Sequence, residues 1–302
     1  MSTTPVPEPL MPYAGLVDDA AIFPPGNAPV PEAVRGHAEH RGAWYAALVG
    51  GFVCADTRLT ELQAALDDTR DDVPRPLRLN LTVIGGAGAI EPALTWVGRD
   101  ERLGLDVLEV ALRDEDDLAR NATRMSTVLG NALPEGVDAY VEMPRLHGAD
   151  ISASWASALD ELAAAGLRLK YRTGGAEHEA FPSCAELAAV IAAALDREVE
   201  FKLTAGLHHA VRHTAGDTGF EHHGFLNVLL ATRASLDGAA EADAAVLLDE
   251  RDPAAVAKQV ADLGAAGVSS TRRWFTSFGS CSVIEPVGDL VELGLVGEGR
   301  TT

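Results

Sequence analysis

The sequence predicts a single closed (β/α)8 barrel of the TIM type, and three observations lead to this fold class. Short β-like runs alternate with Ala/Leu-rich segments of helical spacing along the 302 residues. These runs number eight and recur at intervals of roughly 30 residues, as in repeated βα units. No Gly-x-Gly-x-x-Gly turn follows the first run, which disfavours an open, doubly wound sheet.

The predicted strands are residues 13–21, 44–55, 77–86, 105–113, 137–145, 167–173, 199–206 and 268–279. Among the helices between them, residues 183–195 begin with Ser183, a typical N-cap. Roughly 60 residues separate the last two strands, so we expect extra helices between strands 7 and 8. Asp252 and Pro253 suit the start of one of these helices.

No interdomain linker is visible, so we predict one barrel domain over residues 1–302. The prolines of residues 1–12 predict an extended N-terminal arm. The amino terminus lacks a basic region and an apolar segment of the signal-peptide kind, and no apolar run approaches the ~18 residues of a membrane helix.

Charge and cysteine content narrow the class of protein further. Against 24 basic residues stand 45 acidic ones, giving a formal net charge of −21, which argues against nucleic acid and membranes as partners. The three cysteines are odd in number and lack CxxC spacing, so neither a disulfide framework nor a thiolate metal site is expected. We predict a cytoplasmic protein and leave homo-oligomerisation open.

Polar residues that alternate with apolar ones are expected to point into the barrel, because the outward face of each strand packs on helices. This rule places Glu109, Glu142, Lys170 and Lys202 inside, with the two lysines at about the same height on neighbouring strands. The residues nearer the strand starts, Arg168 and Glu200, are expected to form a buried ion pair that closes the barrel floor.

Paired lysines favour a particular chemistry. At about 6 Å, two ammonium groups repel by roughly 3 kcal/mol, which would lower the pKa of one amine, and burial acts in the same direction. A neutral lysine attacks a carbonyl to form a Schiff base, and a nearby carboxylate shuttles protons. Alternatively, Glu109 and Glu142 contact both lysines, which then stay protonated and form an anion receptor.

Three turns carry a family resemblance: LKYRTGG after strand 6, EFKLTAGLHH after strand 7 and FTSFGSCS after strand 8. In their order and spacing they resemble the deoxyribose-phosphate aldolase family of class I aldolases, as do VEMP and LEVAL in strands 5 and 4. The resemblance covers short patches of the second half and implies a divergent relative. It implies Lys170 as the Schiff-base nucleophile, Lys202 as the group that tunes it and Glu109, where the family has Asp, as the proton shuttle.

Substrate contacts are expected at the C-terminal ends of the strands. Backbone N–H groups in the turns after strands 6 and 8 could hold a phosphate or carboxylate beside Arg172. Asn80, which faces inward from the third strand, could bind a substrate hydroxyl or satisfy a neighbour. The further candidates for substrate binding are Thr173, Gly174, Gly175, Gly206, His208, His209, Gly279, Ser280 and Ser282.

Five of the nine histidines fall between residues 208 and 223, and one or two of them should reach the barrel mouth. We expect no cofactor. The alternative is a divalent metal ion held by Asp18, Asp19, His208 and His209, although His-x-His and HExxH spacings are absent.

Together these features predict a Schiff-base, aldolase-like lyase acting on a small anionic carbonyl or sugar-phosphate-like substrate. The alternatives are a metal-dependent hydrolase or isomerase, which would use the 208–223 histidine cluster, and a non-catalytic anion-binding barrel.

Overall fold

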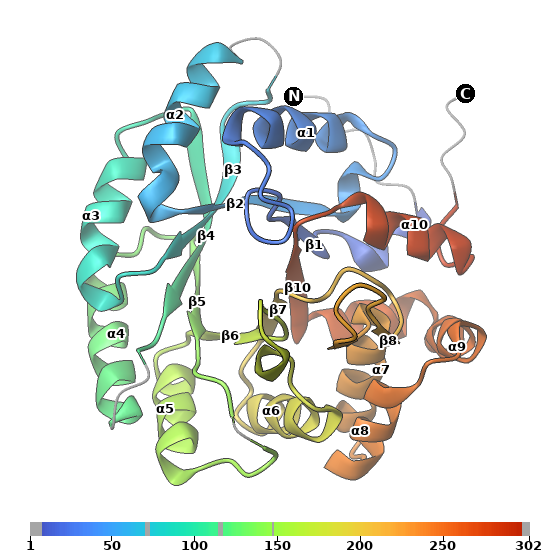
Figure 1. The fold of residues 1–302 in the computed structure, drawn as a ribbon. Coiled ribbons are helices and arrows are strands. Elements are labelled where there is room, and N and C mark those ends of the chain that lie inside the picture. The colour runs from blue at the N-terminus through green and yellow to red at the C-terminus, as the bar shows by residue number, and fades with distance from the viewer. Residues whose placement is uncertain (1–7, 70–72, 114–116, 147, 298–302) are drawn as a thin grey trace.

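The computed structural model describes residues 8–69, 73–113, 117–146 and 148–297. Eight parallel strands close into a barrel in the order β1-β10-β7-β6-β5-β4-β3-β2, which confirms the predicted fold class. Figure 1 shows the helices ringing these strands. The barrel strands are β1 (Val17–Asp19), β2 (Val49–Ala55), β3 (Leu77–Val83), β4 (Leu103–Ala111), β5 (Asp138–Glu142), β6 (Arg168–Arg172), β7 (Phe201–Thr204) and β10 (Phe275–Ser280).

A helix follows each of the first six strands and the last one. These helices are α1 (Val30–Gly42), α2 (Leu59–Asp68), α3 (Ala87–Val97), α4 (Leu118–Ala132), α5 (Ala153–Ala164), α6 (Cys184–Asp196) and α10 (Ile284–Glu292). Short 3-10 turns are η1 (Glu8–Tyr13), η2 (Ala46–Leu48), η3 (Asp56–Arg58) and η4 (His178–Ala180). Ser183 caps α6 as expected, because its side chain accepts a hydrogen bond of 3.1 Å from the Glu186 N–H.

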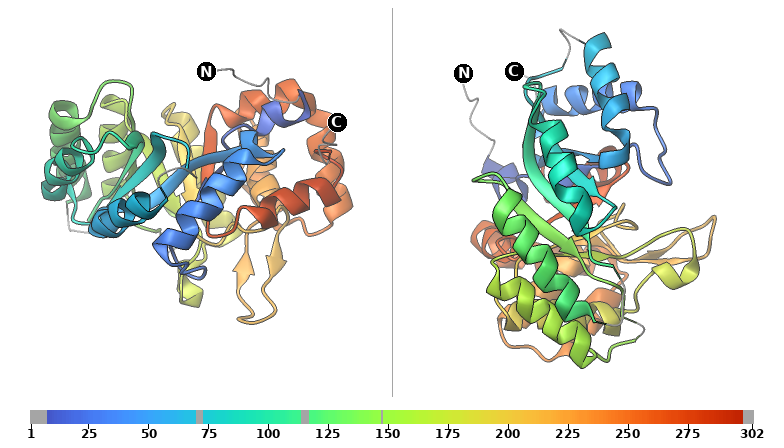
Figure 2. Two further views of the ribbon diagram at one scale, coloured as in Figure 1. Left: turned by 90° about the horizontal axis from the view of Figure 1, so that it is seen from above. Right: turned by 90° about the vertical axis from the view of Figure 1, so that its left-hand side faces the viewer.

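The long interval between β7 and β10 holds α7 (Phe225–Leu236), α8 (Glu241–Asp249) and α9 (Pro253–Arg272). It also holds a small antiparallel hairpin of β8 (His213–Thr214) and β9 (Glu221–His222). Both views of Figure 2 show this hairpin projecting from the body of the molecule. Because it follows β7, it stands at the end of the barrel where the strands finish.

The prediction of an extended arm over residues 1–12 is wrong for its described part. Residues 8–13 form η1, which packs against α9. Leu10 and Tyr13 are only 2% and 4% exposed. Side chains three residues apart share one side of a 3-10 turn, so burying that side stabilises the turn. Residues 1–7 lie outside the described residues.

The eighth strand also begins later than predicted. Residues 268–272 form the last turns of α9, and β10 begins at Phe275. Val268 and Thr271 are buried and three residues apart, which is a helical rather than an alternating pattern. Arg272 ends the helix and donates hydrogen bonds to the Ala14, Phe275 and Thr276 carbonyls.

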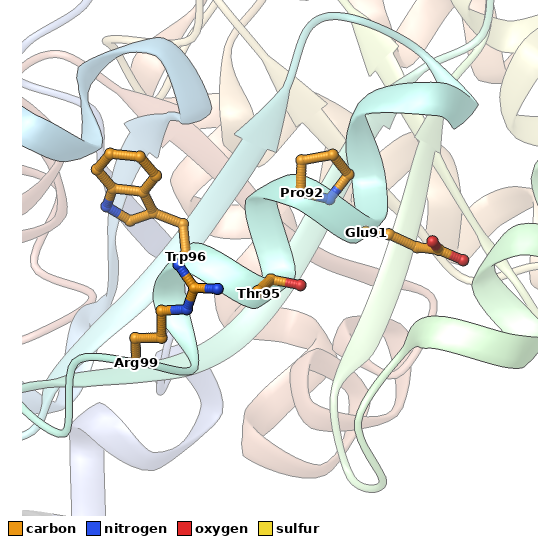
Figure 3. A pocket seen from close by; sticks show the side chains of 5 residues that line it. All are labelled: Glu91, Pro92, Thr95, Trp96 and Arg99. Carbon is orange, nitrogen blue, oxygen red and sulfur yellow. The ribbon is translucent and has the colours of Figure 1, made fainter.

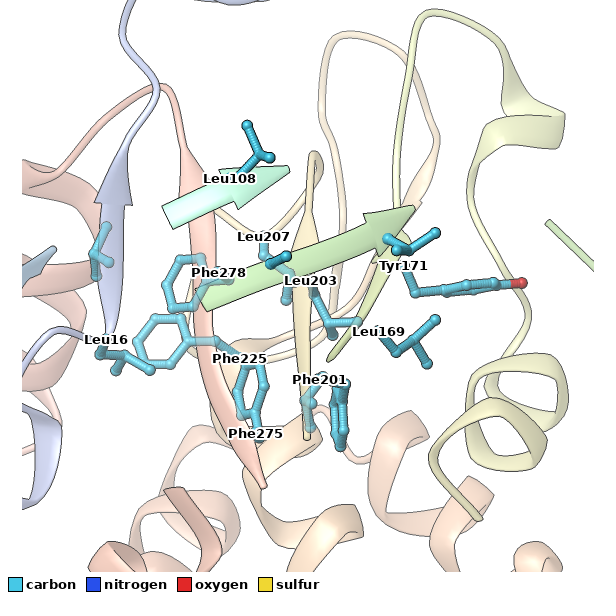
Figure 4. Close-up of a cluster of buried hydrophobic side chains, with 14 of the residues drawn as sticks. Leu16, Leu108, Leu169, Tyr171, Phe201, Leu203, Leu207, Phe225, Phe275 and Phe278 are labelled. Carbon is cyan, nitrogen blue, oxygen red and sulfur yellow. The ribbon is translucent and has the colours of Figure 1, made fainter. Parts of the chain in front are cut away.

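Apolar side chains on the outer faces of the strands pack against the helices (Figure 4). Phe278 of β10 stacks on Phe225 of α7 with 5.0 Å between ring centroids. Tyr171 of β6 is buried, and its hydroxyl donates a 2.7 Å hydrogen bond to Glu186 of α6. The polar residues that alternate with these side chains are left to fill the interior of the barrel.

The stretch His178–Asp196, which contains η4 and α6, is long and apolar enough to cross a membrane by length and composition alone. The expectation that no apolar run approaches the length of a membrane helix is therefore wrong for this stretch. Half of its most apolar window is buried inside the molecule, and α6 packs against α7 and α8. Packing on the barrel therefore accounts for its apolar character.

Candidate active site

The two inward lysines lie side by side. Strands β6 and β7 pair in parallel with Lys170 opposite Lys202. Both residues are buried, with 3% and 1% of their surface exposed. A buried ammonium group is costly unless it is paired, so the groups around these two amines decide their charge.

One carboxylate bridges the two amines. Glu109 of β4 places Oε2 at 2.7 Å from Lys170 Nζ and Oε1 at 2.6 Å from Lys202 Nζ. Thr82 of β3 donates a 3.1 Å hydrogen bond to the same carboxylate. Register explains this meeting, because Thr82 and Glu109 are paired in the β3–β4 ladder. Glu109 therefore lies at the centre of the polar interior.

Each lysine has a second carboxylate. Lys202 Nζ lies 2.6 Å from Asp18 Oδ2 on β1, and Lys170 Nζ lies 2.9 Å from Glu142 Oε2 on β5. Asp18 also accepts hydrogen bonds from Ser277 Oγ at 2.7 Å and from the Gly51 N–H at 3.3 Å. Both amines are thus held between two negative groups.

Of the two expectations for the lysines, a lowered pKa of one amine is wrong. The alternative, that carboxylates keep both amines protonated, agrees with the structure, although Glu142 contacts Lys170 and not Lys202. Burial alone would lower the pKa of Lys170, but attraction to Glu109 and Glu142 outweighs it and raises that pKa. The pKa of Lys202 is raised in the same way, against burial, by Asp18 and Glu109. The two lysines, in turn, overcome the effect of burial and hold the pKa of Glu109 far below its usual value.

Arg172 and Glu142 continue the chain of ion pairs from Lys170 toward the barrel mouth. Arg172, two residues after Lys170 on the same strand face, donates from Nε to Glu142 Oε1 at 2.9 Å. The Arg172 side chain is 42% exposed, whereas that of Lys170 is 4% exposed. The connected groups, which we call the interior network, are Asp18, Glu109, Glu142, Lys170, Lys202 and Arg172. With three cations and three carboxylates, the interior network has no net charge.

Two adjacent glycines make room for this arrangement. A Cβ atom on Gly50 would lie 2.1 Å from Asp18 Oδ1, and one on Gly51 would lie 2.3 Å from Asn80 Oδ1. Asn80 is 1% exposed, and its Oδ1 has no hydrogen-bond partner within the described part of the chain. An unpaired buried acceptor of this kind is usually met by a water molecule or a ligand.

The turns after β6 and β7 pack against each other. A Cβ atom on Gly174 would lie 2.8 Å from the Gly206 Cα atom. Gly206 has a φ of +75°, which favours glycine. Thr173 Oγ1 donates a 2.6 Å hydrogen bond to the Ala205 carbonyl. Close backbone packing accounts for Gly174 and Gly206, whereas Gly175 is exposed.

The turn after β10 is closed by its own side chains. Ser280 Oγ donates a 2.7 Å hydrogen bond to the Ser282 carbonyl. Gly279 lies beside β7, where an added Cβ atom would sit 3.5 Å from Thr204 Oγ1. Anion binding at this turn stays a prediction.

The four residues of the alternative metal site do not converge. His208 and His209 bind Glu285 and Asp289 of α10, at 3.2 and 3.1 Å. Asp19 pairs with His37 of α1 at 3.0 Å, while Asp18 belongs to the interior network. Among the described residues, no group of three or more His, Cys, Asp or Glu is placed to hold a metal ion.

A cluster of histidine and phenylalanine rings lies in the segments that follow β6 and β7, at the mouth of the barrel. The ring of His213 stacks on that of His222, with 5.1 Å between centroids, and Phe181 lies 4.6 Å from His222. His222 Nδ1 lies 3.1 Å from the Gly206 carbonyl, which ties the hairpin to the turn after β7. Burial lowers the pKa of both histidines, which favours their neutral forms.

The floor carries the expected ion pair with one correction. Arg168 Nε lies 2.8 Å from Glu200 Oε2, and a second pair joins Arg168 to Asp138. The side chains of Arg168 and Glu200 are 27% and 38% exposed, so the pair is not buried. The Arg168–Glu200 pair is in contact with solvent and differs in this from the buried lysine–carboxylate pairs of the interior network.

A pocket on the outer surface has no relation to this site. It has a volume of about 430 Å³ and lies along α3 (Figure 3). Its lining residues are Glu91, Pro92, Thr95, Trp96 and Arg99. None of them belongs to the interior network.

One signal in the composition points to the site and was not used to predict it. The chain has only three lysines against 21 arginines, and two of the three lysines meet inside the barrel. Asp18 was expected as a metal ligand or as a residue that points to the site, and its pairing with Lys202 was not predicted. No protein-family model matches the chain, and no curated protein matches it. The fold and site therefore define a class: a TIM barrel with a buried lysine–carboxylate network at the strand ends.

Proposed function

We propose that the protein is an enzyme, a Schiff-base-forming lyase that acts on a small carbonyl compound at Lys170. One observation carries the proposal: Lys170, in the middle of β6 and two residues before the C-terminal end of that strand, places its Nζ between Glu109 and Glu142. Active sites of TIM barrels lie at this end. The amine has carboxylates on two sides, so groups that can take up and return a proton are already in contact with it.

The first step is loss of a proton from Lys170, because the raised pKa of this amine keeps it charged at rest. Glu142 is the better acceptor of the two carboxylates. Its side chain is 17% exposed, against 3% for Glu109, and Glu109 is held by two lysines. The neutral amine then adds to the carbonyl carbon.

The second step is loss of water. The carbonyl oxygen takes two protons, one from the nitrogen and one returned by Glu142, and leaves as water, so that nitrogen and carbon become an iminium group. When the bond between the α and β carbons of the iminium group breaks, its electron pair forms the carbon–carbon double bond of an enamine. A carboxylate takes the proton of the hydroxyl on the departing carbon. Protonation of the enamine and addition of water then release the second product and restore Lys170.

Lys202 supports this chemistry without forming the covalent bond. It is 1% exposed and held by Asp18 and Glu109 at 2.6 Å each, so it stays an ammonium group. Because Glu109 contacts both amines, the positive charge of Lys202 lies on the other side of the Glu109 carboxylate from Lys170. A simple anion receptor is less well supported, because the interior network has no net charge.

The test is reductive trapping. We expect borohydride, added with a panel of small aldehydes and ketones, to fix an adduct on Lys170. With three lysines in the chain, peptide mass spectrometry assigns the site directly. Lys170→Met should abolish the adduct. The matched control is Lys258→Met, which removes an exposed lysine paired with Asp262 and should leave trapping unchanged. Lys170 unmodified by the whole panel would exclude the proposal.

A further inference from the structure

Arg172 is the most exposed cation of the interior network, and it lies directly beside the proposed nucleophile. Its side chain is 42% exposed and reaches Glu142 through Nε alone. The two terminal nitrogens of its guanidinium group make no hydrogen bond to the residues that the structure describes. In a chain with a net charge of −21, an exposed cation with free donors at a barrel mouth is a natural place for an anion.

Glu142 sets the spacing between this cation and Lys170. Its Oε2 lies 2.9 Å from Lys170 Nζ, and its Oε1 lies 2.9 Å from Arg172 Nε. The two nitrogens therefore contact opposite oxygens of one carboxyl group. Glu142 thus links the guanidinium group and the amine through a single carboxyl group, so a small molecule that meets both needs its anionic group close to its carbonyl group, as in a 2-oxo acid.

We infer that the substrate is a 2-oxo acid whose carboxylate binds Arg172 while Lys170 attacks the neighbouring carbonyl. This inference rests on the proposed function and names its substrate class. Arg172 is suited to the role because a guanidinium group binds a carboxylate through two parallel hydrogen bonds. Since Nε stays on Glu142, the substrate can use the terminal nitrogens without displacing that carboxylate.

The chemistry fixes where the substrate breaks. An iminium group at C2 accepts the electron pair of the C3–C4 bond, so the departing carbon is C4. That carbon must carry a hydroxyl, whose proton passes to a carboxylate as the C4 aldehyde forms. The substrate class is therefore a 4-hydroxy-2-oxo acid. The enamine left on Lys170 takes a proton at C3, and water releases the shorter 2-oxo acid.

The experiment compares two ketone probes of similar size, pyruvate and hydroxyacetone, by their rates of borohydride trapping at Lys170. Charge-assisted hydrogen bonds to the carboxylate predict that pyruvate is trapped about 10- to 100-fold more efficiently at low concentration. Arg172→Gln should remove this preference while hydroxyacetone is still trapped. The matched control is Arg197→Gln, which changes an arginine paired with Asp160 in the helical layer and should keep the preference.

The outcomes separate the two proposals. Trapping of both probes without a preference for pyruvate, or a preference that survives in Arg172→Gln, would overturn the 2-oxo acid inference and leave the Schiff base standing. Failure of every carbonyl compound to modify Lys170 would overturn both. Retention of the hydroxyacetone adduct in Arg172→Gln shows that this variant still folds.

Discussion

Glu109 is the residue on which the charge balance of the barrel interior depends. It contacts both buried amines, and no other carboxylate within the described residues does so. Removing one partner from a buried ion pair leaves an uncompensated charge, which costs far more than losing a pair in water. Removing the carboxylate of the Arg168–Glu200 pair, at the barrel floor, would change an ion pair that water already screens.

We therefore expect Glu109→Gln to lower the free energy of unfolding by about 3–5 kcal/mol. Glu200→Gln, the matched control, should change it by about 0–1 kcal/mol, because the Arg168–Glu200 pair is partly exposed. Urea denaturation of the three proteins at neutral pH measures both values. Similar, small losses in both variants would contradict the ion pairing described for Glu109.

For single residues, the sequence predicted which side chains point into the barrel better than it predicted their charge. Alternation along single strands placed Glu109, Glu142, Lys170 and Lys202 inside, because side-chain direction in a strand is a local property. The sequence left the direction of the lysine pKa shifts open, because that direction depends on distances between separate strands. One of the two carboxylate partners of Lys202 is Asp18, 184 residues earlier in the chain, and no local pattern joins them.

The hairpin of β8 and β9 is the element whose stability should respond most to pH. His213 and His222 stack on each other. The groups around them are the rings of His208, His209 and Phe181, the carboxylates of Asp217 and Asp289, and the Gly206 and Val211 carbonyls. Burial lowers the pKa of both rings below the ordinary 6.5, so the unfolded hairpin takes up protons more readily than the folded one. Its stability is present above that value and is lost as the pH falls below it.

Amide hydrogen exchange tests this expectation. Protection factors over residues 213–222 should fall several-fold as the pH is lowered below 6.5, while those of β6 and β7 stay constant. The double variant His213→Phe, His222→Phe keeps ring stacking and removes both titrating groups. Its hairpin should show no such pH dependence, and an equal fall in this variant would rule out the histidines as the cause.

Strands were predicted correctly where the alternation of apolar and polar residues runs through the whole strand. Strands β3, β5, β6 and β7 lie inside the predicted ranges, because each alternates between a helix-facing and an interior side, whereas β4 begins two residues before its predicted range. The end of α9 was misassigned because Val268 and Thr271 are β-branched, although their spacing is helical. The hairpin was not predicted at all, because strands of two residues leave no periodicity to detect.

The whole molecule separates its charges by depth. Its net charge is −21, yet the interior network is balanced, three against three. The fold was predictable because eight βα units repeat one pattern. The sequence predicted which residues belong to the interior network but not which of them form ion pairs. Those pairs exist only when β1, β4, β5, β6 and β7 close into one barrel.

Charge on the two buried lysines is the central claim, and nitrogen-15 NMR of the lysine side chains tests it most directly. Three lysines give three Nζ signals, with the exposed Lys258 as an internal reference. We predict that Lys170 and Lys202 are ammonium groups at neutral pH and lose their protons only above the ordinary lysine value of 10.5. A neutral-amine signal from either buried lysine near pH 7 would contradict this account.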